Sequence, residues 1–129
     1  MSENATAELL KLNQSLLDSI TRGDWAAYEK LCDPSITCFE PEALGRLVEG
    51  MDFHQFYFKL GGVKGNHNTT MCSPHVRVMG DVAVVSYVRL NQRVSGEGEP
   101  VTKGVEETRV WQKQKSGWKH VHFHRSPLK

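Results

Sequence analysis

The most informative stretch of this sequence is residues 76–94, VRVMGDVAVVSYVRLNQRV. The segments on either side of Gly80-Asp81 are rich in β-branched residues, and this dipeptide fits a two-residue hairpin turn. Further strands are predicted over residues 105–111 and 118–125. Consecutive strands joined by short turns form a meander, so the C-terminal half of the chain is predicted to be an antiparallel sheet.

The N-terminal half predicts helices. Leucine and isoleucine recur at helical spacing over roughly residues 6–22, and Asp24 can cap a second short helix. Residues 35–40 predict a short strand, and a third helix is predicted over residues 53–58, with Asp52 as its cap. Together with the meander, this order indicates an α+β fold in which a curved antiparallel sheet wraps around helices to form a cone.

Three arginines are predicted on sheet faces that they share with residues that are usually buried. Alternation of side chains along each strand gives the following neighbours: Arg89 with Val85 and Tyr87, Arg109 with Val105 and Trp111, and Arg125 with Val121 and Phe123. A guanidinium group keeps its proton in proteins, so a buried one needs an anion close by. Either a ligand supplies that anion, as a carboxylate or phosphate, or the protein does. The internal candidates are Glu107, Glu40, Glu42 and Glu49.

Several histidine and tyrosine residues are further candidates for chemistry. His120, His122 and His124 alternate along the last strand and are expected on one face. Such a row could bind zinc, but no carboxylate follows it, and packing against a helix or another subunit is the interpretation we favour. Tyr28 and His54 could point into the cone, where they would hydrogen-bond an anion, act as acid or base, or simply be satisfied core residues.

The third predicted helix carries more aromatic side chains than one sheet can bury. These are Phe53, Phe56, Tyr57 and Phe58. Some of them are therefore expected at a subunit interface. Cys38 is expected to be a small buried apolar residue, because no base is placed beside it.

The composition excludes several classes of protein. The 129 residues fit one domain, residues 1–129, and the net charge of +1 argues against a nucleic-acid partner. No apolar run could cross a bilayer, and the N-terminus lacks a secretion signal. Cys32, Cys38 and Cys72 form no paired pattern, so we expect reduced thiols and a cytoplasmic location. Protein-kinase signatures and a phosphate-binding loop are absent, so we expect no kinase activity in this chain. We also expect no catalytic residues, no cofactor and no metal.

Several long motifs resemble the association, or hub, domain of calcium/calmodulin-dependent protein kinase II. They are CDP at 32–34, FEPEALG at 39–45, VEGMDFHQFYF at 48–58, EETRVW at 106–111 and VHFHRS at 121–126. The resemblance covers roughly residues 8–126. It implies a fold of the nuclear-transport-factor-2-like type and assembly, through dimers, into a large double-layered ring. In full-length members, which bind calmodulin, that ring organises serine/threonine kinase subunits.

The resemblance also implies a deep pocket for small carboxylate ligands, into which a kinase linker peptide has been proposed to reach. Its lining corresponds here to Tyr28, His54, Arg89, Arg109 and Arg125. Three functions follow as hypotheses: a self-assembling ring subunit, a small-carboxylate sensor, or an isomerase or dehydratase-like enzyme on the same cone. We favour the first.

Two features depart from the family pattern. Animal members carry an aromatic residue in the loop after the third helix, where this chain has Gly61-Gly62-Val63-Lys64-Gly65. The resemblance therefore does not extend to a pocket lid built from that loop. The chain also begins with methionine directly before its first helix, so it is either a segment of a kinase or a stand-alone hub-like homologue. The polar residues 2–7 favour the stand-alone alternative.

Overall fold

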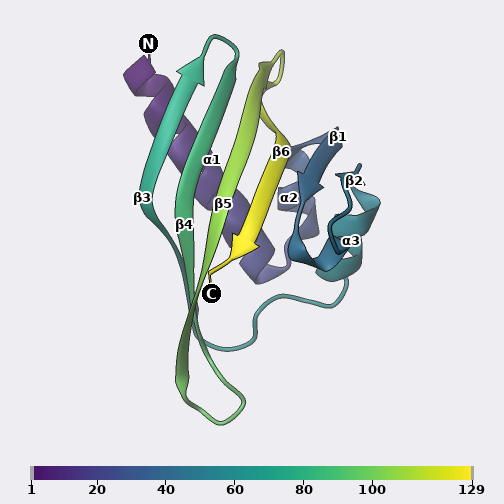
Figure 1. Cartoon of the computed structure of the whole chain (residues 1–129), viewed down its shortest axis with the longest axis vertical. Coiled ribbons are helices and arrows are strands. Elements are labelled where there is room, and N and C mark those ends of the chain that lie inside the picture. The colour runs from purple at the N-terminus through teal and green to yellow at the C-terminus, as the bar shows by residue number, and fades with distance from the viewer. Residues whose placement is uncertain (1, 129) are drawn as a thin grey trace.

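The computed structural model describes residues 2–128 and confirms a mixed α+β fold (Figure 1). Met1 and Lys129, which the single-domain prediction includes, lie outside the described residues. The elements follow in the order α1 (Ser2–Arg22), α2 (Trp25–Leu31), β1 (Cys32–Phe39), the 3-10 turn η1 (Pro41–Ala43), β2 (Val48–Glu49), α3 (Asp52–Phe58), β3 (His67–Met79), β4 (Val82–Val94), β5 (Pro100–Gln114) and β6 (Gly117–Pro127).

One six-stranded sheet, of order β2-β1-β6-β5-β4-β3, organises the molecule. Strands β3 to β6 form the predicted antiparallel meander, and Met79 pairs with Val82 across the turn at Gly80. The pairing of β1 with β6 is parallel, which the prediction of an antiparallel sheet did not include. Figure 1 shows α1 crossing one face of the meander, with α2 and α3 at the β1–β2 end.

The core lies between α1 and the inner face of the sheet. Leu9, Leu16 and Leu17 of α1 are fully buried, as is Trp111 of β5. The helix is amphipathic as predicted, and buried polar contacts help to anchor it: the Trp111 indole donates to the Asn13 side-chain oxygen at 3.0 Å, and the Thr21 and Thr69 hydroxyl groups are 3.0 Å apart. Among the described residues, no helix combines the length and apolar character needed to span a bilayer.

The N-cap of α2 agrees with the prediction, whereas the N-cap of α3 differs from it. The Asp24 carboxylate accepts a hydrogen bond from the Ala27 backbone at 3.2 Å, as an N-cap of α2. Helix α3 instead has Met51 at its N-cap position, without a side-chain hydrogen bond, and Asp52 is already the first helical residue. There its negative charge still faces the positive end of the helix dipole.

The expected row of three histidines on β6 is wrong. His120 pairs with Trp111 whereas His122 pairs with Val110, so Val121 is an extra residue in the ladder. A bulge of this kind reverses the alternation of the strand. His120 is therefore fully buried in the core, while His122 lies on the outer face and hydrogen-bonds Thr37 at 2.7 Å.

The glycine-rich loop after α3 packs closely on the end of α1. The Val63 amide donates to the Thr21 carbonyl at 2.8 Å. A Cβ added to Gly62 would collide with the backbone of Arg22 and lie 2.6 Å from the Thr21 oxygen. The missing side chain at Gly62 is therefore a condition for docking this loop.

We predict that Gly62→Ala destabilises the fold by about 2–3 kcal/mol, because backbone atoms cannot move aside as a side-chain end can. Gly96→Ala is the matched control, since a Cβ there meets nothing within 4 Å. Urea unfolding of both variants, at one protein concentration, measures the difference. Equal midpoints for the two variants would contradict the close approach.

Candidate functional site

A buried carboxylate lies at the centre of the inner face of the sheet. Glu107 of β5 is 2% exposed and stands opposite Tyr87 of β4 in the strand register. It accepts hydrogen bonds from the Tyr87 hydroxyl at 2.6 Å, from Arg89 at 3.2 Å, and from the Arg109 Nε and Nη2 atoms at 3.2 and 3.1 Å. Arg89 and Arg109 thus share one anion that the protein itself supplies.

The charges in this cluster hold one another in the ionised state. Burial raises the pKa of Glu107, but the guanidinium groups of Arg109 and Arg89 outweigh burial and lower it to about 2. Burial lowers the pKa of Arg109, and the Glu107 carboxylate more than reverses this, so its pKa is raised. Tyr87, whose hydroxyl donates to Glu107, has its pKa raised to about 12, first by burial. The cluster is a fixed set of charges at neutral pH.

Arg125 of β6 joins this cluster from the neighbouring strand. It pairs with Glu107 in the register, but its Nε atom is 3.6 Å from that carboxylate, beyond a hydrogen bond. Its Nη1 atom lies 2.7 Å from Glu42 and 3.5 Å from Glu40, which come from η1 and the residue before it. Three of the four internal carboxylates named from the sequence are therefore partners. Glu49 of β2 forms no ion pair among the described residues.

Tyr28 and His54 close the apolar side of the site. The Tyr28 hydroxyl and the His54 Nδ1 atom are 2.8 Å apart, and both side chains are buried. Burial, and then the nearby Arg109 charge, lower the pKa of His54 to about 4, so its imidazole is neutral at pH 7. Burial also raises the pKa of Tyr28. Neither group is charged at neutral pH, and each satisfies the other.

The five side chains named as pocket residues line one cavity of about 230 Å³, here called the inner cavity. They come from α2, α3, β4, β5 and β6, so the fold gathers residues far apart in the sequence. Its wall also contains Glu40 and Glu42, which the sequence identified only as ion-pair partners, and Phe123. Chemically, the inner cavity offers guanidinium donors to an anion, but two carboxylates compete for those donors.

A metal ion has one set of donors available among the described residues. Atoms of Cys38, Glu40 and His54 lie within 4.8 Å of one another. The Cys38 thiol donates to Glu40 at 3.2 Å, and burial, followed by the Glu40 charge, raises the pKa of that thiol. A divalent cation here would also face the positive charges of Arg109 and Arg125. We therefore interpret these three residues as a hydrogen-bonded cluster, with Cys38 buried as expected.

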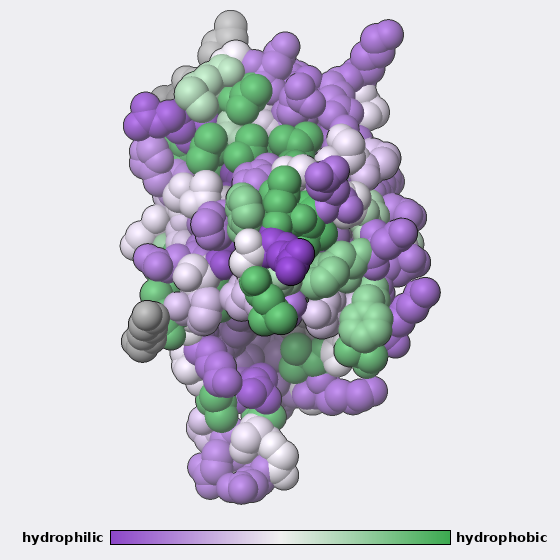
Figure 2. All heavy atoms as spheres, turned by 45° about the vertical axis from the view of Figure 1, so that its right-hand side comes forward, coloured by the Kyte–Doolittle hydropathy of each residue, from purple (hydrophilic) through white to green (hydrophobic). Residues whose placement is uncertain are grey.

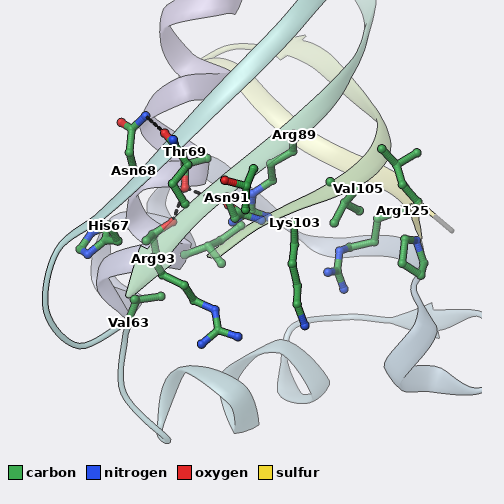
Figure 3. A pocket seen from close by; sticks show the side chains of 17 residues that line it. Val63, His67, Asn68, Thr69, Arg89, Asn91, Arg93, Lys103, Val105 and Arg125 are labelled. Atoms are coloured by element: carbon green, nitrogen blue, oxygen red, sulfur yellow. Dashed lines mark hydrogen bonds between the residues drawn. The ribbon is translucent and has the colours of Figure 1, made fainter. Parts of the chain in front are cut away.

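A second, larger cavity of about 700 Å³ adjoins the first and is here called the outer cavity. Figure 3 shows Arg93, Lys103 and Arg125 extending side by side into its opening, with Arg89 and Asn91 deeper. Arg93 and Lys103 are residues that the sequence analysis missed. Alternation along β4 could have found Arg93, because Arg89, Asn91 and Arg93 follow one another on a single face.

We predict that Glu107→Gln destabilises the protein by about 3–5 kcal/mol, because it leaves Arg89 and Arg109 buried without their anion. Its neighbour Glu106 is exposed on the other sheet face, so Glu106→Gln should change stability by less than about 0.5 kcal/mol. Urea unfolding at pH 7 and at one protein concentration gives both values. A small effect at Glu107 would show that the cluster does not depend on this carboxylate.

The same carboxylate has a defined pH signature. Its pKa is about 2 in the folded chain against an ordinary 4.5, so the unfolded chain binds the proton first. The stabilisation is complete above about pH 4.5 and is lost as the pH falls toward 2. Unfolding experiments between pH 5 and 2 should show a steeper loss of stability in the wild type than in Glu107→Gln. Parallel curves would contradict the lowered pKa.

Comparison with known proteins identifies the family. The family model "Calcium/calmodulin dependent protein kinase II association domain" matches residues 5–129. The chain is 50% identical over 122 residues to the calcium/calmodulin-dependent protein kinase type II subunit delta of Oryctolagus cuniculus. The aligned region covers 92% of this chain and 23% of that protein. The chain thus spans less than a quarter of this curated relative, and no kinase domain lies within it.

Solved structures agree with this assignment. The hub homology domain of the kinase from Chlamydomonas reinhardtii is 53% identical with a TM-score of 0.90, covering 97% of this chain and 99% of that one. The association domain of the C. elegans kinase is 46% identical with a TM-score of 0.91, covering 96% of each chain. A putative dehydratase of the NTF2-like family from Streptomyces avermitilis, 21% identical with a TM-score of 0.81, shares the fold alone.

The predicted nuclear-transport-factor-2-like fold and the predicted family are therefore both confirmed. The chain belongs to the association, or hub, domains of calcium/calmodulin-dependent protein kinase II, the oligomerisation modules of these kinases.

Proposed function

We propose that this chain assembles with copies of itself, through dimers, into a large double-layered ring. Where a kinase of the family is present, we propose that the ring organises its calcium/calmodulin-dependent subunits. The observation that carries this proposal, beyond family membership, is an apolar surface formed by one continuous part of the chain. We define this apolar surface by residues 39–63.

Seven large apolar side chains in residues 39–63 are exposed. They are Phe39, Leu44, Leu47, Phe56, Tyr57, Leu60 and Val63. Leu44 is 88% exposed, Leu60 70% and Phe56 60%. Figure 2 brings the β1–β2–α3 side forward and shows several groups of apolar atoms on it. The aromatic surplus predicted for α3 is thus exposed in the single chain.

The energetic reason for association follows from these exposures. Burying one leucine or phenylalanine side chain contributes about 1.5–3 kcal/mol relative to leaving it in water. Several such side chains can offset the cost of bringing two chains together. Exposed apolar side chains in one segment therefore favour contact with another copy of the chain, as the word "association" in the family description indicates.

We predict that the wild-type chain elutes as a multi-subunit assembly of defined mass in size-exclusion chromatography with light scattering. Phe56→Glu together with Leu60→Glu should reduce that mass, because charges would be placed in a buried contact. The matched control is Met79→Glu, which changes a residue 51% exposed at the β3–β4 turn. A wild-type monomer or simple dimer at micromolar concentration would contradict the ring.

We further propose that the inner cavity binds small carboxylates, or the carboxylates of a linker peptide. All five pocket residues named from the sequence line it. Arg125 supports this role because it is the least buried of the three arginines, and its partner Glu42 is itself 38% exposed. Burial raises the pKa of Glu42, but the Arg125 charge outweighs burial and lowers it, so Glu42 is the anion that a ligand must replace.

We predict opposite effects of two single substitutions on the binding of valerate, a five-carbon monocarboxylate. Arg125→Gln should weaken binding roughly tenfold, because it removes a charge-assisted hydrogen bond. Glu42→Gln should strengthen binding, because it removes the competing carboxylate. Isothermal titration calorimetry at low salt, with elution volume as a check on assembly, measures both. Equal affinities in all three proteins would contradict a carboxylate site at Arg125.

The two remaining hypotheses receive different support. A pure carboxylate sensor would bind valerate as above without forming a ring, so the two experiments together separate it from the first proposal. No observation favours an isomerase or dehydratase. Glu107, the most buried carboxylate of the cluster, has its pKa lowered to about 2 and is a weak base.

Cys32, Cys38 and Cys72 are all free thiols, which supports the proposed cytoplasmic location.

A further inference from the structure

The outer cavity differs from the inner cavity in its charge. In the inner cavity, Arg89, Arg109 and Arg125 are matched by carboxylates that line the wall or lie beneath it. Among the described residues, the outer cavity is lined by four permanent cations and by no aspartate or glutamate. These cations are Arg89, Arg93, Lys103 and Arg125. The uncompensated positive charge of this region therefore lies in the outer cavity.

Two of these cations lack an internal partner. Arg93 and Lys103 are exposed, and neither takes part in any ion pair among residues 2–128. Glu97 and Glu99, at the tip of the β4–β5 hairpin, do not line the cavity. Unlike Arg109, these side chains do not stabilise a buried carboxylate, so their shared direction has no explanation in the packing of the core.

The strand register explains why they converge. Asn91 pairs with Lys103 and Arg93 pairs with Val101, so Arg93 and Lys103 are diagonal neighbours on one face of the hairpin. This face is the continuation of the one that carries Val85, Tyr87 and Arg89. Figure 3 shows the Arg93 and Lys103 side chains reaching the same opening as Arg125.

The two cavities are joined by shared walls. Arg89 and Arg125, together with Ile20 and Asn91, line both of them. The Nε atoms of Arg89 and Arg125 are buried and have no hydrogen-bond partner within residues 2–128, so both arginines retain an unused donor. Buried donors are satisfied in the great majority of cases, and a ligand that reaches the shared wall could satisfy them. The outer cavity, at about 700 Å³, also has the size typical of small-molecule sites.

We propose that Arg93 and Lys103 form a second anion subsite, so that the joined cavities take a small organic acid with two or more carboxylates. One carboxylate lies at the shared wall, near Arg125, and the second lies between Arg93 and Lys103. This inference rests on the proposed carboxylate binding of the inner cavity and specifies its ligand. Asn91, which also lines the outer cavity and lies between Arg89 and Arg93 on the same face of β4, supplies a side-chain amide between the two charged ends.

The test compares two probes of equal carbon number, valerate with one carboxylate and glutarate with two, by calorimetry on the assembled protein at low salt. Wild type should bind glutarate about tenfold more tightly than valerate. This is the effect expected when the second carboxylate of glutarate contacts the exposed charges of Arg93 and Lys103. Arg93→Gln with Lys103→Gln should remove this difference and leave valerate binding unchanged. Arg77→Gln with Lys115→Gln, both at exposed positions outside the two cavities, changes the net charge equally and should preserve the difference.

Each other outcome has a definite meaning. Equal affinities for the two probes in wild type, or a difference that survives Arg93→Gln with Lys103→Gln, overturns the second subsite. An equal loss in the control variant also overturns it, because general electrostatics would then be the cause. Glutarate binding that depends on Arg93 and Lys103, without any valerate binding, supports the outer subsite while the inner carboxylate site fails. Absence of binding by both probes overturns both proposals.

Discussion

The ion cluster around Glu107 is the constraint on which the inner face of the sheet depends. Removing two guanidinium groups and a carboxylate from water costs several kcal/mol for each ion, and only close pairing offsets that cost. Glu107 meets this condition because it contacts Arg89, Arg109 and Tyr87 at once. Apolar residues of similar size could fill the same volume at similar stability. The cluster therefore contributes more than stability: it presents fixed positive charge to a cavity.

The surrounding core keeps this cluster in place. Arg109 is 1% exposed, and its guanidinium carbon lies 4.4 Å from the centre of the Phe123 ring. His120 lies against the same guanidinium and stacks on Phe123, with burial and the Arg109 charge lowering its pKa. A neutral histidine avoids adding a charge beside an arginine. The bulge at Val121, which moves His120 into the core, is thus linked to the electrostatics of the site.

The alternation of side chains along a strand made the sheet faces of the arginines predictable. The same reasoning failed for the histidines of β6, where the strand is irregular. Strands β4 and β5 pair without a break, so the predicted faces of Arg89 and Arg109 are correct. The histidines of β6 were misplaced because a bulge has no residue pattern that single-sequence reasoning can recognise here. The early start of β3 was missed because residues 67–75 are polar and mostly exposed. Glu107 was named from the sequence, but choosing it over a ligand required the distances.

The outer cavity was missed for a different physical reason. Side chains continue to alternate along β4 beyond Arg89, but they are no longer buried there. The reason is that the β4–β5 hairpin extends past the helices that cover the sheet (Figure 1). A sheet face that leaves the core must change from apolar to polar side chains. In this chain the change begins with Arg89, which is still buried, and continues through Asn91 to Arg93 and Lys103, which are exposed. Because the cations outnumber the carboxylates along this face as it opens, the outer cavity has the net positive charge that the proposed second anion subsite requires.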